Sequence, residues 1–214
     1  MFTNNPITKK ISKNSLPFVM IFLLFSTINV FSQDGPEVKE IELKKGLHLV
    51  YDLTQGESIY QYIVDFTSVD ENGVVFDWKM TEPVNKSGTI TITKEAWATA
   101  KMLDFYPATK TFDKDEISMI FGKQVFDKLA SFKTNDTISF GCNACFRGIT
   151  TTDVVKNSYE VQDHSNTLAS INTLKFSSIY KNGNFEVLNN AKFPLIVYFK
   201  WRMTIELKSY SYIK

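Results

Sequence analysis

Residues 195–207 read Leu-Ile-Val-Tyr-Phe-Lys-Trp-Arg-Met-Thr-Ile-Glu-Leu, and every second residue of this stretch, seven in all, is apolar. Charged and hydroxyl side chains fill the alternate positions from Lys200 to Glu206. Because successive side chains of a strand point to opposite faces, this period of two predicts one long amphipathic strand. A strand cannot satisfy its backbone groups alone, so the stretch also predicts partner strands and a hydrophobic core.

The same alternation recurs near the start of the domain, at residues 47–54, 60–67, 74–81 and 87–93. Short turns separate these stretches, and one of them contains Asn72-Gly73, a pair that favours tight hairpins. Sequential strands joined by short turns predict an antiparallel meander. Further strands are predicted at the following places: 116–121, 137–140, 158–162, 168–179 and 185–188, with a hairpin turn at Asn182-Gly183.

Two segments between the meander and the later strands show a helical period instead. The first follows Thr93, a suitable N-cap, and places Ala96, Ala100 and Leu103 on one face. The second covers roughly residues 122–133, where apolar residues recur at helical spacing. We therefore predict an α+β fold that is mainly β, as a curved antiparallel sheet or half barrel with two inserted helices.

The N-terminal segment has the pattern of a secretory signal peptide. A basic stretch precedes an apolar run from Leu16 to Phe25, which is too short to span a bilayer as a helix. Small residues at Val30 and Ser32 predict cleavage after residue 32, with export to the periplasm or beyond the cell. We expect a loose polar leader at 33–45 and a single β-rich domain at 46–214, with no membrane span after cleavage.

Charge and motifs exclude several classes of function. Three of the 24 basic residues and none of the 23 acids lie in residues 1–32, so the mature chain carries 21 basic and 23 acidic residues, a net charge of −2. This near-neutral balance argues against nucleic-acid binding. The chain has two histidines and lacks nucleophile-elbow, zinc-protease, Walker and dinucleotide motifs. We expect no metal and no cofactor, and we favour a non-enzymatic function over an enzymatic one.

Cys142-Asn143-Ala144-Cys145 is the one conspicuous motif. In an exported protein the favoured interpretation is a local disulfide between Cys142 and Cys145. Two free buried thiols, a catalytic dithiol and a metal site are the alternatives. A redox pair requires its first thiolate at a helix N-terminus, whereas the residues after Cys145 have no helical period. A metal site requires four ligands, which the chain does not offer near this pair.

Aromatic residues gather on the predicted inner faces of the strands. This pattern is typical of an ordinary core, and it is also compatible with a half-open barrel whose interior holds a lipid-like ligand. The residues that would line such an interior are Tyr51, Tyr62, Phe76, Trp78, Phe199 and Trp201.

Titratable residues fall mostly on the predicted outer faces. His48 is expected to be solvated there, and His164 lies in a predicted turn. Asp65, Asp77 and Glu206 also point outward, and a carboxylate pair on neighbouring strands could serve glycoside hydrolysis. Their spacing selects no pair.

Three stretches carry a resemblance to a known family: Asp77-Trp-Lys-Met-Thr81, Gly88-Thr-Ile-Thr-Ile92, and Phe193-Pro-Leu-Ile-Val197 followed by Trp201 and Ile205-Glu-Leu207. They resemble a family of uncharacterised exported bacterial β-proteins, a domain of unknown function with TapB-like members. The resemblance covers about residues 46–210. It implies a curved antiparallel sheet with inserted helices, similar to half-barrel lipoprotein carriers, and it implies no catalytic residues. The cysteine pair is not part of the family pattern.

These observations together predict a monomeric, exported cell-envelope protein that binds a hydrophobic ligand or an envelope protein without catalysing a reaction. Two alternatives remain open. One is a thiol-disulfide redox protein that uses Cys142 and Cys145, and the other is a purely structural secreted domain.

Overall fold

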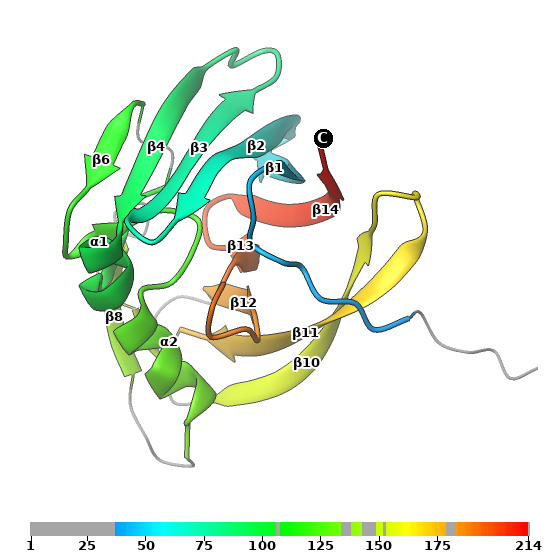
Figure 1. Cartoon of the computed structure of the whole chain (residues 1–214). Helices are drawn as coiled ribbons and strands as arrows, with labels where there is room; N and C mark the ends of the chain where they lie inside the picture. Colours follow the sequence, from blue (N-terminus) through cyan, green and yellow to red (C-terminus); the bar gives the residue numbers. More distant parts are fainter. Residues whose placement is uncertain are drawn as a thin grey trace, which may run out of the picture. The chain divides into compact units, whose positions relative to one another are not determined.

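Strands dominate the computed structural model, which describes residues 37–105, 108–133, 138–142, 149–151, 153–178 and 183–213 (Figure 1). Ten of the strands form one sheet in the order β10-β11-β12-β13-β14-β1-β2-β3-β4-β6. The bounds of these ten strands are β1 Leu47–Gln55, β2 Ser58–Asp70, β3 Gly73–Met80, β4 Ser87–Thr93, β6 Lys110–Phe112, β10 Val154–Gln162, β11 Leu168–Ser177, β12 Asn184–Leu188, β13 Ile196–Lys200 and β14 Thr204–Tyr212.

The predicted meander is confirmed in β1 to β4. These strands pair antiparallel in sequence order, and the turn between Asp70 and Gly73 joins β2 to β3 as expected. Along β1 and β3 the inner residues are buried and the outer ones are partly or fully exposed. The alternation of the sequence therefore reports the two faces of this half of the sheet correctly.

Both predicted helices are present in the segment between β4 and β10, but the first is shorter than predicted and Leu103 lies in a strand, β5, instead. Helix α1 (Lys94–Thr99) is capped by Thr93, whose hydroxyl accepts a hydrogen bond from the Ala96 amide at 3.1 Å. Helix α2 (Lys123–Ala130) buries one apolar face. The same segment supplies a small sheet of order β7-β5-β8-β9, with bounds β5 Met102–Leu103, β7 Glu116–Ile117, β8 Ile138–Cys142 and β9 Ile149–Thr151.

This inserted segment packs on the inner face of the large sheet. The ring of Phe105 stacks on Phe199 of β13 at 4.8 Å between centroids. Phe121 meets Phe185 of β12 edge-on at 6.3 Å, and the Ile196 amide donates to the Met119 carbonyl at 2.9 Å. The inner aromatic residues of the strands thus face the side chains of the insert. Within the described residues, no helix has the length and apolar character needed to cross a bilayer.

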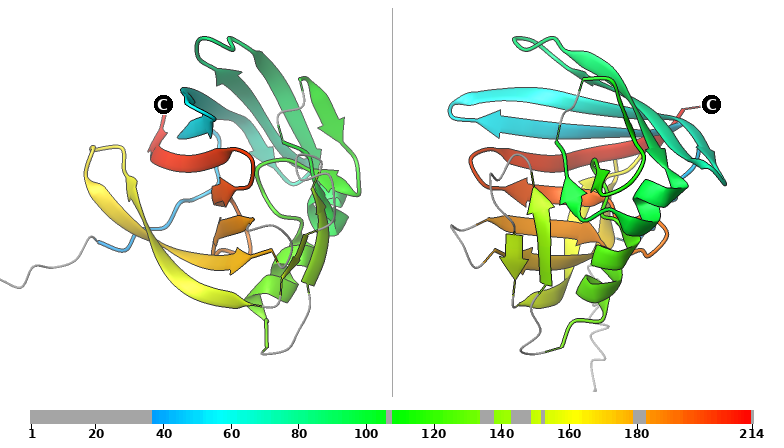
Figure 2. Two further views of the ribbon diagram at one scale, coloured as in Figure 1. Left: turned by 180° about the vertical axis from the view of Figure 1, so that it is seen from behind. Right: turned by 90° about the vertical axis from the view of Figure 1, so that its left-hand side faces the viewer.

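The later strands correct the half-barrel prediction. Strands β10 to β14 close into a five-stranded barrel, because Gln162 of β10 pairs in parallel with Ser209 of β14. The Tyr159 hydroxyl supports this closure by donating to the Leu207 carbonyl at 3.1 Å. Strands β1, β2, β3, β4 and β6 then extend from β14 as an open wing (Figure 2).

The long strand predicted at 195–207 is wrong, because this stretch is a hairpin of β13 and β14. Phe199 pairs with Ile205 and Lys200 with Thr204, which leaves a three-residue turn at 201–203. Because the turn has an odd number of residues, odd-numbered residues of β13 stand opposite odd-numbered residues of β14 and lie on the same face. The period of two therefore continues through the turn without a break. Trp201 is consequently a partly exposed turn residue rather than part of an inner row.

The expected loose leader is also different from residue 37 onward. Residues 37–45, which we call the N-terminal strap, lie against β11 and the barrel closure. The Lys39 amide donates to the Ser170 carbonyl at 2.7 Å, and the Lys39 ammonium contacts the Asp163 carboxylate at 2.6 Å. Ile41 is completely buried. The strap is therefore part of the packed domain.

Candidate functional site

Four of the six predicted interior residues are completely buried. Tyr51, Tyr62, Phe76 and Phe199 are at most 1% exposed, and the Tyr62 ring lies 6.2 Å from Tyr51. Burial raises the pKa of the Tyr62 hydroxyl well above its usual range. Of the six predicted residues, Trp78 alone lines one of the two pockets described below.

The cysteine predictions lie outside the described residues. Strand β8 ends at Cys142, and neither its side chain nor Cys145 belongs to the described part of the chain. The disulfide and the redox alternative therefore stay predictions. Among the described residues, no group of three or more His, Cys, Asp or Glu side chains is arranged to hold a metal ion.

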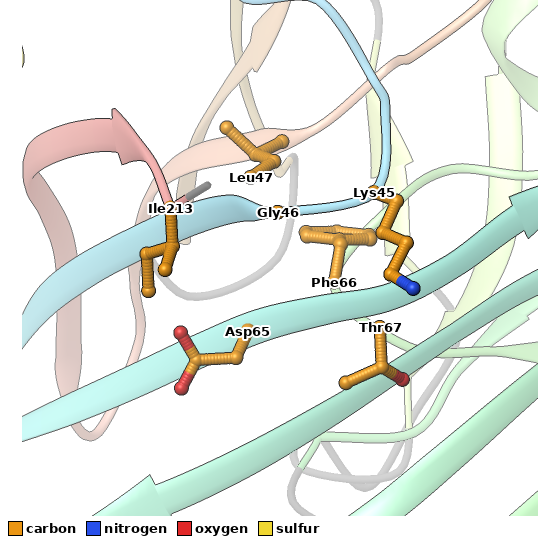
Figure 3. Close-up of a pocket in the computed structure, with 7 residues that line it drawn as sticks. All are labelled: Lys45, Gly46, Leu47, Asp65, Phe66, Thr67 and Ile213. Atoms are coloured by element: carbon orange, nitrogen blue, oxygen red, sulfur yellow. The ribbon is translucent and has the colours of Figure 1, made fainter.

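A pocket of about 640 Å³ opens on the outer face of the wing, where β1 begins between β14 and β2 (Figure 3). We call it the Gly46 depression, and its lining residues are Lys45, Gly46, Leu47, Asp65, Phe66, Thr67 and Ile213. Gly46 continues the sheet, since it donates to the Phe66 carbonyl at 2.8 Å and accepts from the Ile213 amide at 2.7 Å. Gly46 therefore lines the depression with its backbone alone.

Two backbone irregularities lie in the lining of this depression. Gly46 has a φ of +86°, and a Cβ there would lie 2.3 Å from the Ile213 carbonyl oxygen, so glycine is required. A bulge interrupts β2 at Thr67, which also lines the depression. Bulges redirect side chains and are over-represented beside functional sites. The depression is therefore a local departure from a regular sheet surface.

Opposite charges stand at the two ends of the depression. Figure 3 shows the Lys45 ammonium at the Thr67 end and the Asp65 carboxylate beside Ile213. Among the described residues Lys45 has no carboxylate within ion-pair distance. Asp65 accepts a hydrogen bond at one oxygen, Oδ1, from His48 Nδ1 at 2.6 Å. Its second oxygen, Oδ2, has no protein donor in this part of the chain.

The His48–Asp65 contact corrects the prediction of a merely solvated histidine. Since a carboxylate only accepts, Nδ1 of a neutral His48 carries the proton and the other ring nitrogen is an acceptor. Ser211 stands opposite His48 on β14, so Ser211, His48 and Asp65 are consecutive neighbours across three strands. The described structure contains no hydrogen bond from Ser211 to His48. This row therefore lacks the nucleophile–base contact that acyl transfer needs.

The row formed by Ser211, His48 and Asp65 continues across the wing to β3. Asp65 stands opposite Asp77 on β3, and Asp77 accepts a hydrogen bond from the Thr89 hydroxyl at 2.6 Å. A second, smaller pocket of about 320 Å³ lies here and shares Asp65 with the Gly46 depression. Sequence reasoning placed Asp65 and Asp77 on the outer face but did not pair them. Directly opposed carboxylates repel each other, and each of these two accepts one side-chain hydrogen bond, Asp65 from His48 and Asp77 from Thr89.

No protein-family model, curated protein or solved structure matches this chain. The resemblance to the exported TapB-like family therefore stays a prediction, and the site is argued from its own residues.

Sequence reasoning missed the depression, although one signal for it is present. A two-residue turn at Gly56-Glu57 sets Gln55 opposite Ser58 and hence His48 opposite Asp65, as the structure shows. Continuing that register places Gly46 at the edge of the outer face. The left-handed φ of Gly46 and the bulge at Thr67 have no comparable signal in the sequence.

Proposed function

We propose that this protein is an exported binding module and that the Gly46 depression is its ligand site. The export proposal rests on the signal-peptide pattern of residues 1–32. The binding proposal rests on the depression itself, whose volume of about 640 Å³ lies within the range typical of small-molecule sites. This keeps the predicted class of function and moves the site from the inner face to the outer face.

One observation carries the proposal: an apolar surface with a positive and a negative charge on either side of it. The exposed side chain of Ile213 supplies the apolar surface, while Lys45 and Asp65 stand at the two ends of the depression (Figure 3). Ligand sites commonly combine an apolar surface with a few polar groups that fix orientation. The inner face, by contrast, is occupied by packed aromatic rings.

The proposal is tested by amide NMR spectra of residues 33–214 recorded with a library of small soluble fragments. Bound fragments are expected to shift the amide signals of Gly46, Asp65 and Ile213. The variant Thr67→Trp should fill the depression and abolish these shifts.

Gln61→Trp is the matched control, because Gln61 is an exposed residue on the same face of the same strand but outside the depression. It should bind as the wild type does. Fragments that shift only signals far from Gly46, or that bind Thr67→Trp equally well, would refute the proposed site.

A lipid-like ligand remains the alternative for the inner face. It is tested by native mass spectrometry of the purified protein, and a bound lipid mass would favour it over the depression.

A further inference from the structure

One edge of strand β10 is almost without a partner strand, and we call it the open edge. The opposite edge pairs with β11 at every residue from Val154 to Gln162. On the open edge the described structure pairs β10 with another strand at Gln162 alone, where Ser209 of β14 closes the barrel. Figure 1 shows β10 along the lower margin of the domain, with β11 above it. Both faces of the strand are exposed at residues 155–158, so a further strand can reach this edge.

Hydrogen bonds on β11 show which way the backbone groups of that strand point. Ser170 exchanges two backbone hydrogen bonds with the N-terminal strap, at 2.7 and 2.9 Å. The Asn172 carbonyl accepts a hydrogen bond from the Asn189 amide at 2.9 Å. These partners lie on the side of β11 that is away from β10. Ser170 and Asn172 therefore direct their backbone groups away from β10.

The directions on β11 fix those on β10. Residues that stand opposite each other in an antiparallel pair either bond to each other or both point away. Glu160 stands opposite Ser170, and Ser158 stands opposite Asn172. Glu160 and Ser158 therefore direct their N–H and C=O groups to the open edge, and Lys156 does the same because the direction alternates along a strand. Within the described residues no backbone hydrogen bond uses these groups.

The two charges on this edge match a second copy of the same strand. In an antiparallel pair centred on Ser158, Lys156 of each copy stands opposite Glu160 of the other copy. All of these residues direct their backbone groups to the open edge, so the hydrogen bonds and the charges agree on one register. Pairs centred on Asn157 or Tyr159 bring no opposite charges together. In the described structure neither Lys156 nor Glu160 has an ion-pair partner within its own chain.

We infer that β10 is a homodimer interface, in which two copies of the chain pair antiparallel about Ser158. A two-fold axis sets the same surface of each copy against the other. A lone lysine on an edge strand opposes pairing, but here Glu160 of the second copy neutralises Lys156. Val155, which is 55% exposed, then stands opposite Val161 of the second copy.

This interface replaces the predicted monomer with a weak dimer, because the paired segment covers only residues 156–160. It lies on β10, whereas the Gly46 depression is lined by β1, β2 and the residue after β14. The two proposals therefore stand or fall separately.

The test is sedimentation velocity of residues 33–214, a chain that contains every described residue, from about 10 μM to about 1 mM protein. The wild type should show a monomer–dimer equilibrium. Lys156→Glu and Glu160→Lys, each alone, set like charges opposite each other and should weaken dimerisation roughly tenfold. The double variant Lys156→Glu/Glu160→Lys restores opposite charges and should dimerise as the wild type does. The melting temperature of each variant confirms that it is folded.

A mixture of the two single variants gives the sharpest result. One variant then carries two glutamates on the open edge and the other carries two lysines, so both cross-strand pairs of a heterodimer are attractive. The heterodimer should form at concentrations where neither variant dimerises alone. Lys79→Glu is the matched control, since Lys79 is exposed on β3 and both edges of that strand are paired. It should dimerise as the wild type does.

A chain that stays monomeric throughout this range would overturn the inference. A dimer that all the charge variants form equally well would also overturn it, because its interface would then lie elsewhere. The same holds if neither the double variant nor the mixture regains the dimer, since the losses in the single variants would then not come from the pairing of Lys156 with Glu160.

Discussion

The inner and outer faces of β1 to β3 are built from alternate residues of the same strands, yet they differ in almost every respect. On the inner face Tyr51, Tyr62 and Phe76 are fully buried and their neighbours fill the space around them. On the outer face His48, Asp65 and Asp77 stand in a polar row beside an open depression. The inner positions therefore determine whether the domain folds, and the outer positions determine what its surface can bind.

Substitutions at two adjacent residues of β3 test most directly whether the two faces differ in their contribution to stability. Phe76→Ala should lower the free energy of unfolding by about 3–5 kcal/mol, because it removes a buried ring and leaves a cavity. Asp77→Asn, on the opposite face, should change it by less than about 1 kcal/mol. Urea unfolding followed by circular dichroism measures both. A similar loss in the two variants would show that the outer row is part of the stabilising structure.

Two glycines near the ends of β1 test how closely β14 packs against the lining of the depression. Gly46 and Gly56 both have positive φ, at +86° and +62°, but a Cβ on Gly56 would meet nothing within 4 Å. Gly56→Ala should cost about 1 kcal/mol from backbone strain alone. Gly46→Ala adds a clash with the Ile213 carbonyl and should cost about 2–3 kcal/mol. Thermal unfolding compares them, and equal costs would mean that β14 yields easily at this point.

The sequence predicts the wing well because its contacts are local. Each of the strands β1 to β4 pairs with the next through a short turn, and the alternation marks which face each residue takes. The barrel closure could not be predicted, because Gln162 and Ser209 are distant in sequence and share a single parallel bridge. The turn at 201–203 could not be predicted, because a turn of three residues leaves the alternation of apolar and polar residues unbroken.

The candidate site was only half predictable for a similar reason. The hairpin register already sets His48 opposite Asp65. A regular ladder counted back from the Asp70–Gly73 turn would place Asp65 opposite Trp78, whereas the bulge at Thr67 places it opposite Asp77. One extra residue in β2 thus decides which side chains share the outer row, and no residue type marks it.

The buried carboxylate of Asp163 contacts the N-terminal strap, and its charge can be tested through the pH dependence of stability. Asp163 is 2% exposed, and the hydrogen bond from the Lys39 ammonium, together with those from the Ser165 and Thr167 amides, lowers its pKa from 3.8 to about 2. The ionised form is thus favoured by folding, so its stabilisation is complete above pH 4 to 5 and is lost as the pH falls toward 2. Unfolding of the wild type between pH 2 and 6 should show this loss.

Asp163→Asn is the comparison for that titration. The difference in stability between the wild type and this variant should be largest near neutral pH and should shrink below pH 4. A difference that is constant from pH 6 to pH 2 would mean that Asp163 contributes through its shape and not through its charge.

The smallest effect is expected within the outer row itself. Thr89→Val removes the hydroxyl that donates to Asp77 but keeps a β-branched side chain suited to a strand. Because this hydrogen bond is exposed, its loss should cost no more than about 0.5–1 kcal/mol, which urea unfolding can resolve. Thr91→Val is the matched control, since Thr91 lies on the same face of β4 and has Thr111 as its neighbour. If Thr89→Val alone raises the free energy of unfolding, Thr89 holds the Asp65–Asp77 pair in a strained arrangement. The outer row then lowers the stability of the fold.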